Sequence, residues 1–476
     1  MSAYLVPGVY TEYAPSESMS ISRGGNMSVA ALIGPFQSIT NASEDTCVFV
    51  ESWLQFCEKF ISTDHEISVT VTSTKPTTPP TDGSGSGSNI KMTSWTHSHL
   101  LGEWTTARHI LSVKSFFENG GAKAYVIPCD AAATLRSKKN QKDSLTKSPP
   151  NDLVPIIEQY PDINLLVWCG EAQYRSKIYN ALLPLVNSND NARFLLTDTI
   201  NDAEAALVTE QANVGVWTPY IIKKITAVLP RESRIVVSGY QDEENADESP
   251  ASDIFLADLK VRNNALYLKI LADLKASFSA FQEKPVELSP VAAVAGQFAH
   301  KEQKNGIWHS PAGMDVTLQG ITGITRNFTE SECAGLNEKG INALRYFSRP
   351  TPGVRVFGAR TQLDSPDWRY IGVRRLYQMI NRDLRNTLNK KVFSPNKAST
   401  WNAVRSAVNS YLTALWNDGA LAGEKASEAF QVNVGHNITM SNEDILNGIM
   451  IVEVKFAPVR PAEFVVLRFS QIMDAA

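Results

Sequence analysis

"INLLVWC", residues Ile163–Cys169, is an unbroken apolar run with the length of one buried strand. Four more short apolar runs share this character, at Ser28–Gly34, Ala122–Pro128, Ala192–Asp198 and Arg234–Gly239. Amphipathic stretches suited to helices lie between them, at Ala107–Gly121 and Ala172–Asn187. Continuous apolar strands that alternate with amphipathic helices predict an α/β fold whose mainly parallel sheet is covered on both faces.

Length, composition and charge limit the class of protein. At 476 residues the chain is too long for a single core, so we expect roughly two to four domains. A hydrophobic content of 43% and a charged content of 20% are typical of globular proteins. The net charge of −4 argues against general affinity for nucleic acid or anionic membranes, because such affinity requires an excess of basic residues.

Signals for membranes and export are not visible. No apolar run reaches the length of a membrane span, and the first residues lack the basic and apolar segments of a secretory signal. The five cysteines include no C-x-x-C pair, which is typical of thiols kept reduced in a cytoplasm. We therefore expect neither membrane insertion nor structural disulfides.

Residues 1–22 are predicted to form an N-terminal arm. They carry strand-forming side chains on both sides of Pro7-Gly8, among them Tyr4, Val6, Val9 and Tyr10. A strand this short needs an existing sheet to join. The polar, glycine-containing residues that follow predict a tether between the arm and the rest of the chain.

The remaining chain is predicted to form two domains. Residues 23–355 are assigned to the α/β domain and residues 356–476 to a C-terminal α+β domain. Three segments depart from the α/β pattern, because one is rich in Pro, Thr, Gly and Ser, one is rich in Lys, and one begins with an acidic run. These segments, near 62–104, 131–150 and 240–290, are predicted to be surface insertions, and the Pro/Thr/Gly/Ser tract makes the first an exposed loop that cannot build a core.

The C-terminal third predicts two helices followed by two strands. The helices are expected at Trp368–Leu388 and Ala398–Asp418, the second capped by Ser399 or Thr400 and ended by Gly419. The first strand, Gly448–Ala457, alternates Met450, Val452, Val454 and Phe456 on one face. The second strand, Glu463–Phe469, carries Phe464 and Val466.

Motifs for enzyme chemistry are missing from the sequence. There is no G-x-x-x-x-G-K-[ST] phosphate loop, no G-x-G-x-x-G after a strand, and no G-x-S-x-G nucleophile elbow. His97, His99 and His109 are close in sequence, yet no carboxylate or cysteine accompanies them at the spacing of metal ligands. We therefore predict no catalytic, cofactor-binding or metal-binding residues.

One segment concentrates positive charge. "DWRYIGVRRLYQMINRDLR", Asp367–Arg385, holds five arginines in nineteen residues of a net acidic chain. On a helix, four of them gather on the side opposite the apolar stripe: Arg374, Arg375, Arg382 and Arg385. Such a face is compatible with plain solvent or with an acidic partner. DNA is disfavoured, because no DNA-reading motif or basic domain surrounds the helix.

The C-terminal half resembles the sheath proteins of contractile phage tails, R-type pyocins and phage-tail-like injection particles. The resemblance runs in order through Asn305–Gly313, Gly340–Thr361, Asp367–Ile380, Trp401–Gly423 and Asn447–Phe469. Near the N-terminus, "YLVPGVYTEY" and "FFENGGAKAYVIP" are similar to further signatures of the family. The long insertions make the chain look most like sheaths of the antifeeding-prophage and Photorhabdus virulence-cassette particles.

The resemblance implies a structural machine and no enzyme. Sheath subunits stack as hexameric rings around an inner tube, and they contract to drive the tube through a target envelope. The implied partners are other copies of the chain, the tube protein, baseplate and terminal cap proteins and sheath paralogues, with no nucleic acid. The α/β domain of the family has a subtilisin-like outline without a working triad. Assembly in the bacterial cytoplasm and action in a released particle are also implied.

In this family an N-terminal arm and a C-terminal strand complete a sheet on a neighbouring subunit. The resemblance therefore implies strand exchange through the arm residues and the two C-terminal strands given above. It places the four arginines either against the tube or against a neighbouring sheath subunit. The alternatives from other classes are a non-contractile α/β binding module and a hydrolase-like enzyme.

Overall fold

In the computed structural model, the described residues are 20–36, 46–60, 67–74, 94–100, 108–131, 152–187, 192–224, 229, 231–240, 252–283 and 285–463. The chain divides into two compact units. The body unit is Asn26–Arg374, and the terminal unit combines Met1–Gly25 with Arg375–Ala476. This division falls later along the chain than the predicted boundary at 355/356.

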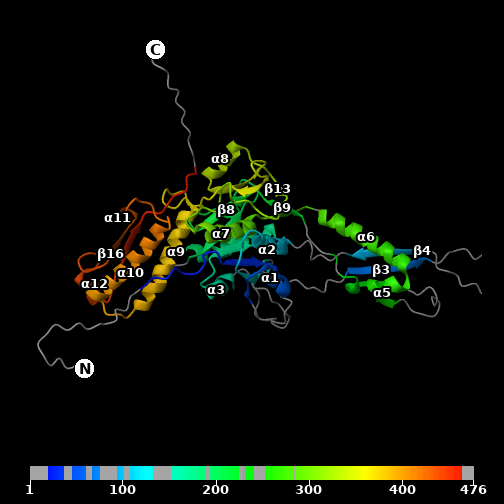
Figure 1. Ribbon diagram of the computed structural model, residues 1–476, viewed down its shortest axis with the longest axis horizontal. Coiled ribbons are helices and arrows are strands. Elements are labelled where there is room, and N and C mark those ends of the chain that lie inside the picture. The colour runs from blue at the N-terminus through cyan, green and yellow to red at the C-terminus, as the bar shows by residue number, and fades with distance from the viewer. Residues whose placement is uncertain are drawn as a thin grey trace, which may run out of the picture. The chain divides into compact units, whose positions relative to one another are not determined.

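An eight-stranded sheet forms the centre of the body unit (Figure 1). Its inner strands β5, β1, β6, β7, β8 and β14 pair in parallel in this order. The edge strands β2 and β15 pair antiparallel. The strands are β1 (Ala30–Gly34), β2 (Val48–Val50), β5 (Ala124–Pro128), β6 (Leu165–Trp168), β7 (Phe194–Asp198), β8 (Val214–Thr218), β14 (Ile341–Phe347) and β15 (Gly353–Val356). The predicted α/β class with a mainly parallel sheet is confirmed.

Helices cover both faces of this sheet, and successive residues of one strand bury on opposite sides. In β1, Ala30 and Leu32 belong to one apolar cluster, whereas Ala31 and Ile33 belong to another. The first cluster includes side chains of α1 (Trp53–Phe60), α2 (Arg108–Glu118) and α7 (Val291–Asn305). The second includes α3 (Leu153–Glu158) and α4 (Arg175–Asn187). Double coverage explains why these strands are continuous apolar runs.

Four of the five predicted strands begin within two residues of their predicted start and belong to the main sheet. The fifth, Arg234–Gly239, is a strand but was assigned to the wrong sheet. It is β10 (Ile235–Tyr240), which pairs with β3 (Ile67–Thr74) and β11 (Ser252–Phe255). The main sheet takes β8 instead, whose apolar run "VGVWT" is interrupted by Gly215 and was overlooked in the sequence.

Two of the segments predicted as surface insertions, 62–104 and 240–290, contribute to a second folded region of the body unit. A four-stranded sheet runs in the order β11-β10-β3-β4, where β4 is Ser94–Leu100. Helices α5 (Leu256–Arg262) and α6 (Asn264–Glu283) supply the rest of its core. The prediction was wrong here, because alternating side chains such as Val69 and Val71 are buried against these helices. Residues 75–93, which hold most of the low-complexity tract, lie outside the described residues.

The body unit also holds a three-stranded sheet, β12-β9-β13, and a short helix. These elements are β9 (Ile221–Lys224), β12 (Pro285–Leu288), β13 (Gly323–Ile324) and α8 (Glu330–Glu338). In α8, Thr329 and Glu332 form a reciprocal capping box at the N-terminus. None of the helices that the structure describes has the length and hydropathy needed to cross a bilayer. No disulfide joins any two of the five cysteines, all of which lie in the described residues.

The terminal unit is built from two long helices and a two-stranded sheet (Figure 1). Its elements are α9 (Ile371–Leu388, whose first residues belong to the body unit), α10 (Ala398–Asn417), α11 (Ala426–Ala429), β16 (Phe430–Asn433), α12 (Asn442–Leu446) and β17 (Glu453–Phe456). The predicted bounds of α10 agree within one residue. Gly419, with φ +81°, follows its end as expected.

Two local predictions in the terminal unit were wrong. The N-cap of α10 is Lys397, which makes no side-chain cap. Thr400 instead donates its hydroxyl to the carbonyl of Pro395 at 2.7 Å. The strand predicted from Gly448 is shorter, because Gly448 has φ +72° and β17 begins only at Glu453.

The apolar core formed by the four-stranded sheet with helices α5 and α6 can be tested by mutation. Ile270 on α6 is fully buried, whereas Leu268 on the same helix is 55% exposed. Replacing Ile270 with Ala removes buried methyl groups and leaves a cavity, so we expect a loss of about 2–4 kcal/mol in unfolding free energy. The matched change Leu268→Ala should cost less than about 0.5 kcal/mol. Urea unfolding of both variants, followed by circular dichroism, measures the difference, and equal losses would contradict an independent core.

Candidate assembly interface

The two-stranded sheet of the terminal unit has two open edges. Strands β16 and β17 pair antiparallel, and among the described residues neither has a second strand partner. The amide of Ala457 donates to the carbonyl of Ala429 at 2.8 Å, which extends the ladder by one pair. Hydrogen-bonded pairs alternate along an antiparallel ladder, so Val432 and Val454 turn their backbone groups toward the outer edges. Each edge can therefore accept a further strand.

The two faces of this sheet differ in polarity. On one face Val432 is buried, and the ring of Phe456 stacks on Tyr377 of α9 with a centroid distance of 6.5 Å. On the other face Asn433 donates to Glu453 at 2.9 Å. A further strand would thus need alternating apolar and polar side chains to extend both faces.

The structure brings only part of the predicted exchange set together. Val454 and Phe456 lie in β17, whereas Met450 and Val452 precede it, and all four are partly buried. The other predicted residues lie outside the described residues, namely Tyr4, Val6, Val9, Tyr10, Phe464 and Val466. Their part in strand exchange stays a prediction.

The four arginines of α9 do not form one exposed face. Arg374 is 6% exposed and Arg375 is 3% exposed. The Nε of Arg374 donates to the side-chain oxygen of Asn213 at 2.6 Å, and its guanidinium lies 4.9 Å from the ring centroid of Trp368. Arg382 is mostly covered, and only Arg385 is exposed. The predicted single-sign surface is therefore corrected, because half of its charge serves packing and hydrogen bonds within the chain.

An apolar patch instead marks the end of α9. Phe393 is fully exposed and has φ +69°, which is uncommon for a bulky residue. It lines one groove together with Val392, Met450 and Val452. Asn396 ties the two loops together by donating to the carbonyl of Ile449 at 3.1 Å. We call Val392, Phe393, Leu446, Ile449 and Ile451 the apolar patch, and all five are at least 40% exposed.

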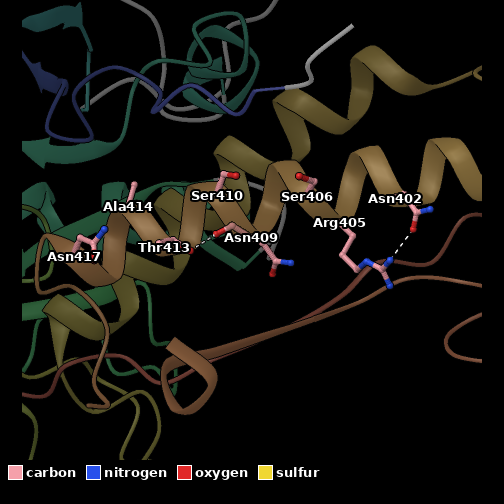
Figure 2. A pocket seen from close by; sticks show the side chains of 8 residues that line it. All are labelled: Asn402, Arg405, Ser406, Asn409, Ser410, Thr413, Ala414 and Asn417. Atoms are coloured by element: carbon pink, nitrogen blue, oxygen red, sulfur yellow. Dashed lines mark hydrogen bonds between the residues drawn. The ribbon is translucent and has the colours of Figure 1, made fainter. Parts of the chain in front are cut away.

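Helix α10 presents a shallow polar groove (Figure 2). Apart from Ala414, its lining side chains end in amides, hydroxyls and one guanidinium, with no carboxylate. Arg405 donates to Asn402 at 2.6 Å, and Thr413 donates to the carbonyl of Asn409 at 2.8 Å. These side chains provide no acid–base pair, so the groove is suited to a wet contact and carries no catalytic constellation.

Two clusters in the body unit resemble enzyme sites but are closed. Asp198, 2% exposed, accepts hydrogen bonds from Tyr179 and Tyr220 at 2.9 Å each, and Arg175 lies 3.6 Å from it. Burial raises the pKa of both tyrosines, which keeps them protonated as donors. The hydrogen bonds and the ion pair of this buried carboxylate are all made within the chain, so a substrate cannot reach it.

The second cluster pairs a lysine with a serine. Lys223 lies 3.3 Å from the hydroxyl of Ser115 and contacts Glu118, and burial lowers the pKa of Lys223. Ser115 is 1% exposed and donates to the carbonyl of Leu111. Buried in this way, the serine cannot reach a substrate. No cluster of three or more metal-ligating side chains occurs in the described part of the chain.

Sequence reasoning missed the apolar patch. The available signal was Val392-Phe393, an apolar pair after a lysine pair and before Ser394-Pro395, where a helix end is expected to be polar. Exposure could not be read from that pattern.

Comparison with known proteins gives two concordant results. Residues 364–472 match the family described as the phage tail sheath C-terminal domain. The chain is also similar to the anti-feeding prophage helical sheath in its contracted state, with 28% identity and a TM-score of 0.65 over 98% of this chain and 100% of that chain. No curated protein matched in sequence.

Two further structures are similar over nearly the whole chain. A chain of the six-fold symmetrised anti-feeding prophage baseplate shows 27% identity and a TM-score of 0.63, covering 99% of this chain and 100% of that chain. A chain of the contracted sheath complex of the PVC, an extracellular contractile injection system, shares the fold at 24% identity and a TM-score of 0.61, covering 99% of both chains. The sheath resemblance seen in the sequence is thus confirmed: residues 364–472 match the sheath C-terminal domain, and nearly the whole chain is similar to sheath and baseplate structures of contractile particles.

Charge reversal on α9 tests the corrected assignment of the arginines. Arg374→Glu would bury a carboxylate against the side-chain oxygen of Asn213, so we expect a loss of about 3 kcal/mol or more in unfolding free energy. Arg385→Glu changes an exposed side chain of the same helix and should cost less than about 1 kcal/mol. Thermal unfolding of both variants measures this. Equal melting temperatures would show that Arg374 is exposed like Arg385, as the sequence predicted.

Proposed function

We propose that the chain is the sheath subunit of a released phage-tail-like particle. Its copies stack as hexameric rings around an inner tube, join a baseplate and a terminal cap, and shorten to drive the tube through a target envelope. Assembly takes place in the bacterial cytoplasm, and sheath paralogues share the particle. The body unit keeps a subtilisin-like outline without catalytic work.

The observation that carries this proposal is the similarity to the contracted anti-feeding prophage sheath over 98% of this chain and 100% of that chain. The similarity extends over both units, so it does not reflect a single domain that two otherwise different proteins share. The six-fold symmetry of the related baseplate structure supports rings of six. The closed Asp198 and Lys223 clusters support a role without turnover, and they disfavour the hydrolase alternative.

Strand exchange is the proposed link between subunits. Residues 4–13 of one copy add a strand to an open edge of the β16–β17 sheet of another copy, and residues 463–469 of a further copy take the other edge. Main-chain hydrogen bonds supply the continuity, and alternate side chains set the register. Tyr4, Val6 and Tyr10 have the alternate spacing of one strand face, which would suit the apolar inner face that Val432 and Phe456 form.

The apolar patch is proposed to be covered by a neighbouring copy of the chain. Its five exposed apolar side chains come from two segments that Asn396 links, and their exposure is costly in water unless a partner covers them. The patch borders the segment that leads into β17, so it is continuous with the proposed exchange edge. Of the four arginines of α9, only Arg385 is exposed, and we propose that it contacts the tube or a neighbouring copy.

Removal of the arm tests strand exchange. Deleting residues 2–14 should leave a folded subunit that forms no stable tubes, because the recipient edge then has no added strand. Electron microscopy and sedimentation measure assembly, and circular dichroism reports the fold. A chain lacking residues 75–89 is the matched control, since this tract has no capacity to build a core, and it should assemble normally. Normal tubes from the arm-deleted chain would refute the exchange.

Removal of the Phe393 side chain tests the apolar patch. Phe393→Gly deletes a fully exposed ring at a left-handed backbone position that glycine favours, so subunit stability should change by less than about 0.5 kcal/mol. Assembly should nevertheless weaken, seen as a raised protein concentration for tube formation. Val261→Ser, at a side chain that is 88% exposed on α5, is the control for loss of surface hydrophobicity. An unchanged threshold for Phe393→Gly would leave the patch without a role.

A further inference from the structure

The root of the arm is docked within the terminal unit. The guanidinium of Arg23 lies 2.5 Å from the carboxylate of Asp418, just after the end of α10. The next residue, Gly24, packs so closely on α9 that a Cβ atom there would overlap Arg382 and meet Asp383 at 2.5 Å. Gly25 has no neighbouring atom within 4 Å of the same position. The contact at Gly24 is therefore specific to one residue of the segment.

A buried charge lies under this contact. Asp383 is 1% exposed, and its carboxylate accepts from Arg382 Nε and from the hydroxyl of Tyr411 on α10, at 2.9 Å each. Burial, followed by the charge of Asp383, raises the pKa of Tyr411, so the tyrosine stays a donor. The three side chains bind α9 to α10, and removing one partner would leave a buried charge unpaired. Arg382, Asp383 and Tyr411 therefore form a rigid docking surface, called the seat below, for the segment at Gly24.

We propose that Arg382, Asp383, Tyr411 and Asp418 form a clasp that docks residues 23–24 on α9 and α10 and fixes where the N-terminal arm leaves the subunit. The use of this clasp in assembly rests on the proposed strand exchange, but the docking does not. The clasp gives Arg382 a role inside the subunit. It also places the start of the arm in the same unit as the open edges of β16 and β17. An exchange linkage would then begin and end on terminal units.

Cleavage by trypsin after Arg23 reports the clasp in the isolated subunit. When Arg23 is paired and Gly24 is packed, the bond between them cannot enter the protease, so cleavage tracks undocking. Asp418→Asn removes the pair at a helix C-terminus, where a negative charge is unfavourable, so it should not lower the melting temperature. It should raise the cleavage rate roughly two- to fivefold, the scale of a half-exposed ion pair.

The glycine pair supplies a matched steric test. Gly24→Ala places a Cβ atom against the Arg382 guanidinium and the Asp383 carboxylate. Because Asp383 is buried and holds both Arg382 and Tyr411, we expect the segment to shift in preference to these side chains and cleavage to rise more than about tenfold. Gly25→Ala should leave it unchanged, because a Cβ there meets nothing. Rates are divided by those of peptides 18–30 with the same substitutions, which corrects for the preference of trypsin. Glu443→Gln, an exposed acid of the same unit, is the charge control.

Each outcome decides the proposal. Faster cleavage in Gly24→Ala and Asp418→Asn, with both controls unchanged, supports the docking. Equal rates in Gly24→Ala and Gly25→Ala overturn it. Electron microscopy of Gly24→Ala then tests the purpose of the clasp, since a misdirected arm should lower the yield of tubes severalfold. Normal tubes from an undocked variant would overturn the exit-point role, whereas strand exchange itself is judged by the arm deletion.

Discussion

Backbone N–H and C=O groups at the edge of a β-sheet need hydrogen-bond partners, and the two units of this protein meet that need differently. The body unit buries its central sheet under helices on both faces, and residues 313–318 hydrogen-bond to the outer edge of β15, so that edge is satisfied within the chain. The terminal unit stops at two strands and leaves two edges. A two-stranded ribbon is marginal by itself, and a third and fourth strand from other copies would complete it.

The terminal unit pairs this incompleteness with a rigid support. Helices α9 and α10 are joined by Asp383 and Tyr411 through a buried hydrogen bond, and Tyr377 and Phe456 stack between α9 and β17. A rigid seat with open edges suits a subunit that must stay linked to its neighbours through a large change of arrangement. The strain of such a change would then fall on the arm and its tether.

Charge has different roles on the two ends of α9. At the N-terminal end, Arg374 is buried and hydrogen-bonded to Asn213. Toward the C-terminal end, Arg382 neutralises Asp383 beneath Gly24, and Arg385 is exposed. Apolar side chains then follow, with Val392 and Phe393 exposed to solvent. The helix therefore passes from internal support to external contact within a few turns.

The sequence by itself determined the features that depend on neighbours along the chain. Runs such as Ile163–Cys169 indicated buried parallel strands, and the stripe and glycine stop of Ala398–Asp418 located α10 within one residue. The order of motifs through the C-terminal half indicated the sheath family. Only the tertiary structure decided which surfaces face solvent. Arg374 is buried because it meets Asn213, 161 residues away, and Val69 joins a core with Ile270. Local patterns report periodicity and charge, whereas burial depends on which distant segments pack together, and that information is spread over the whole chain.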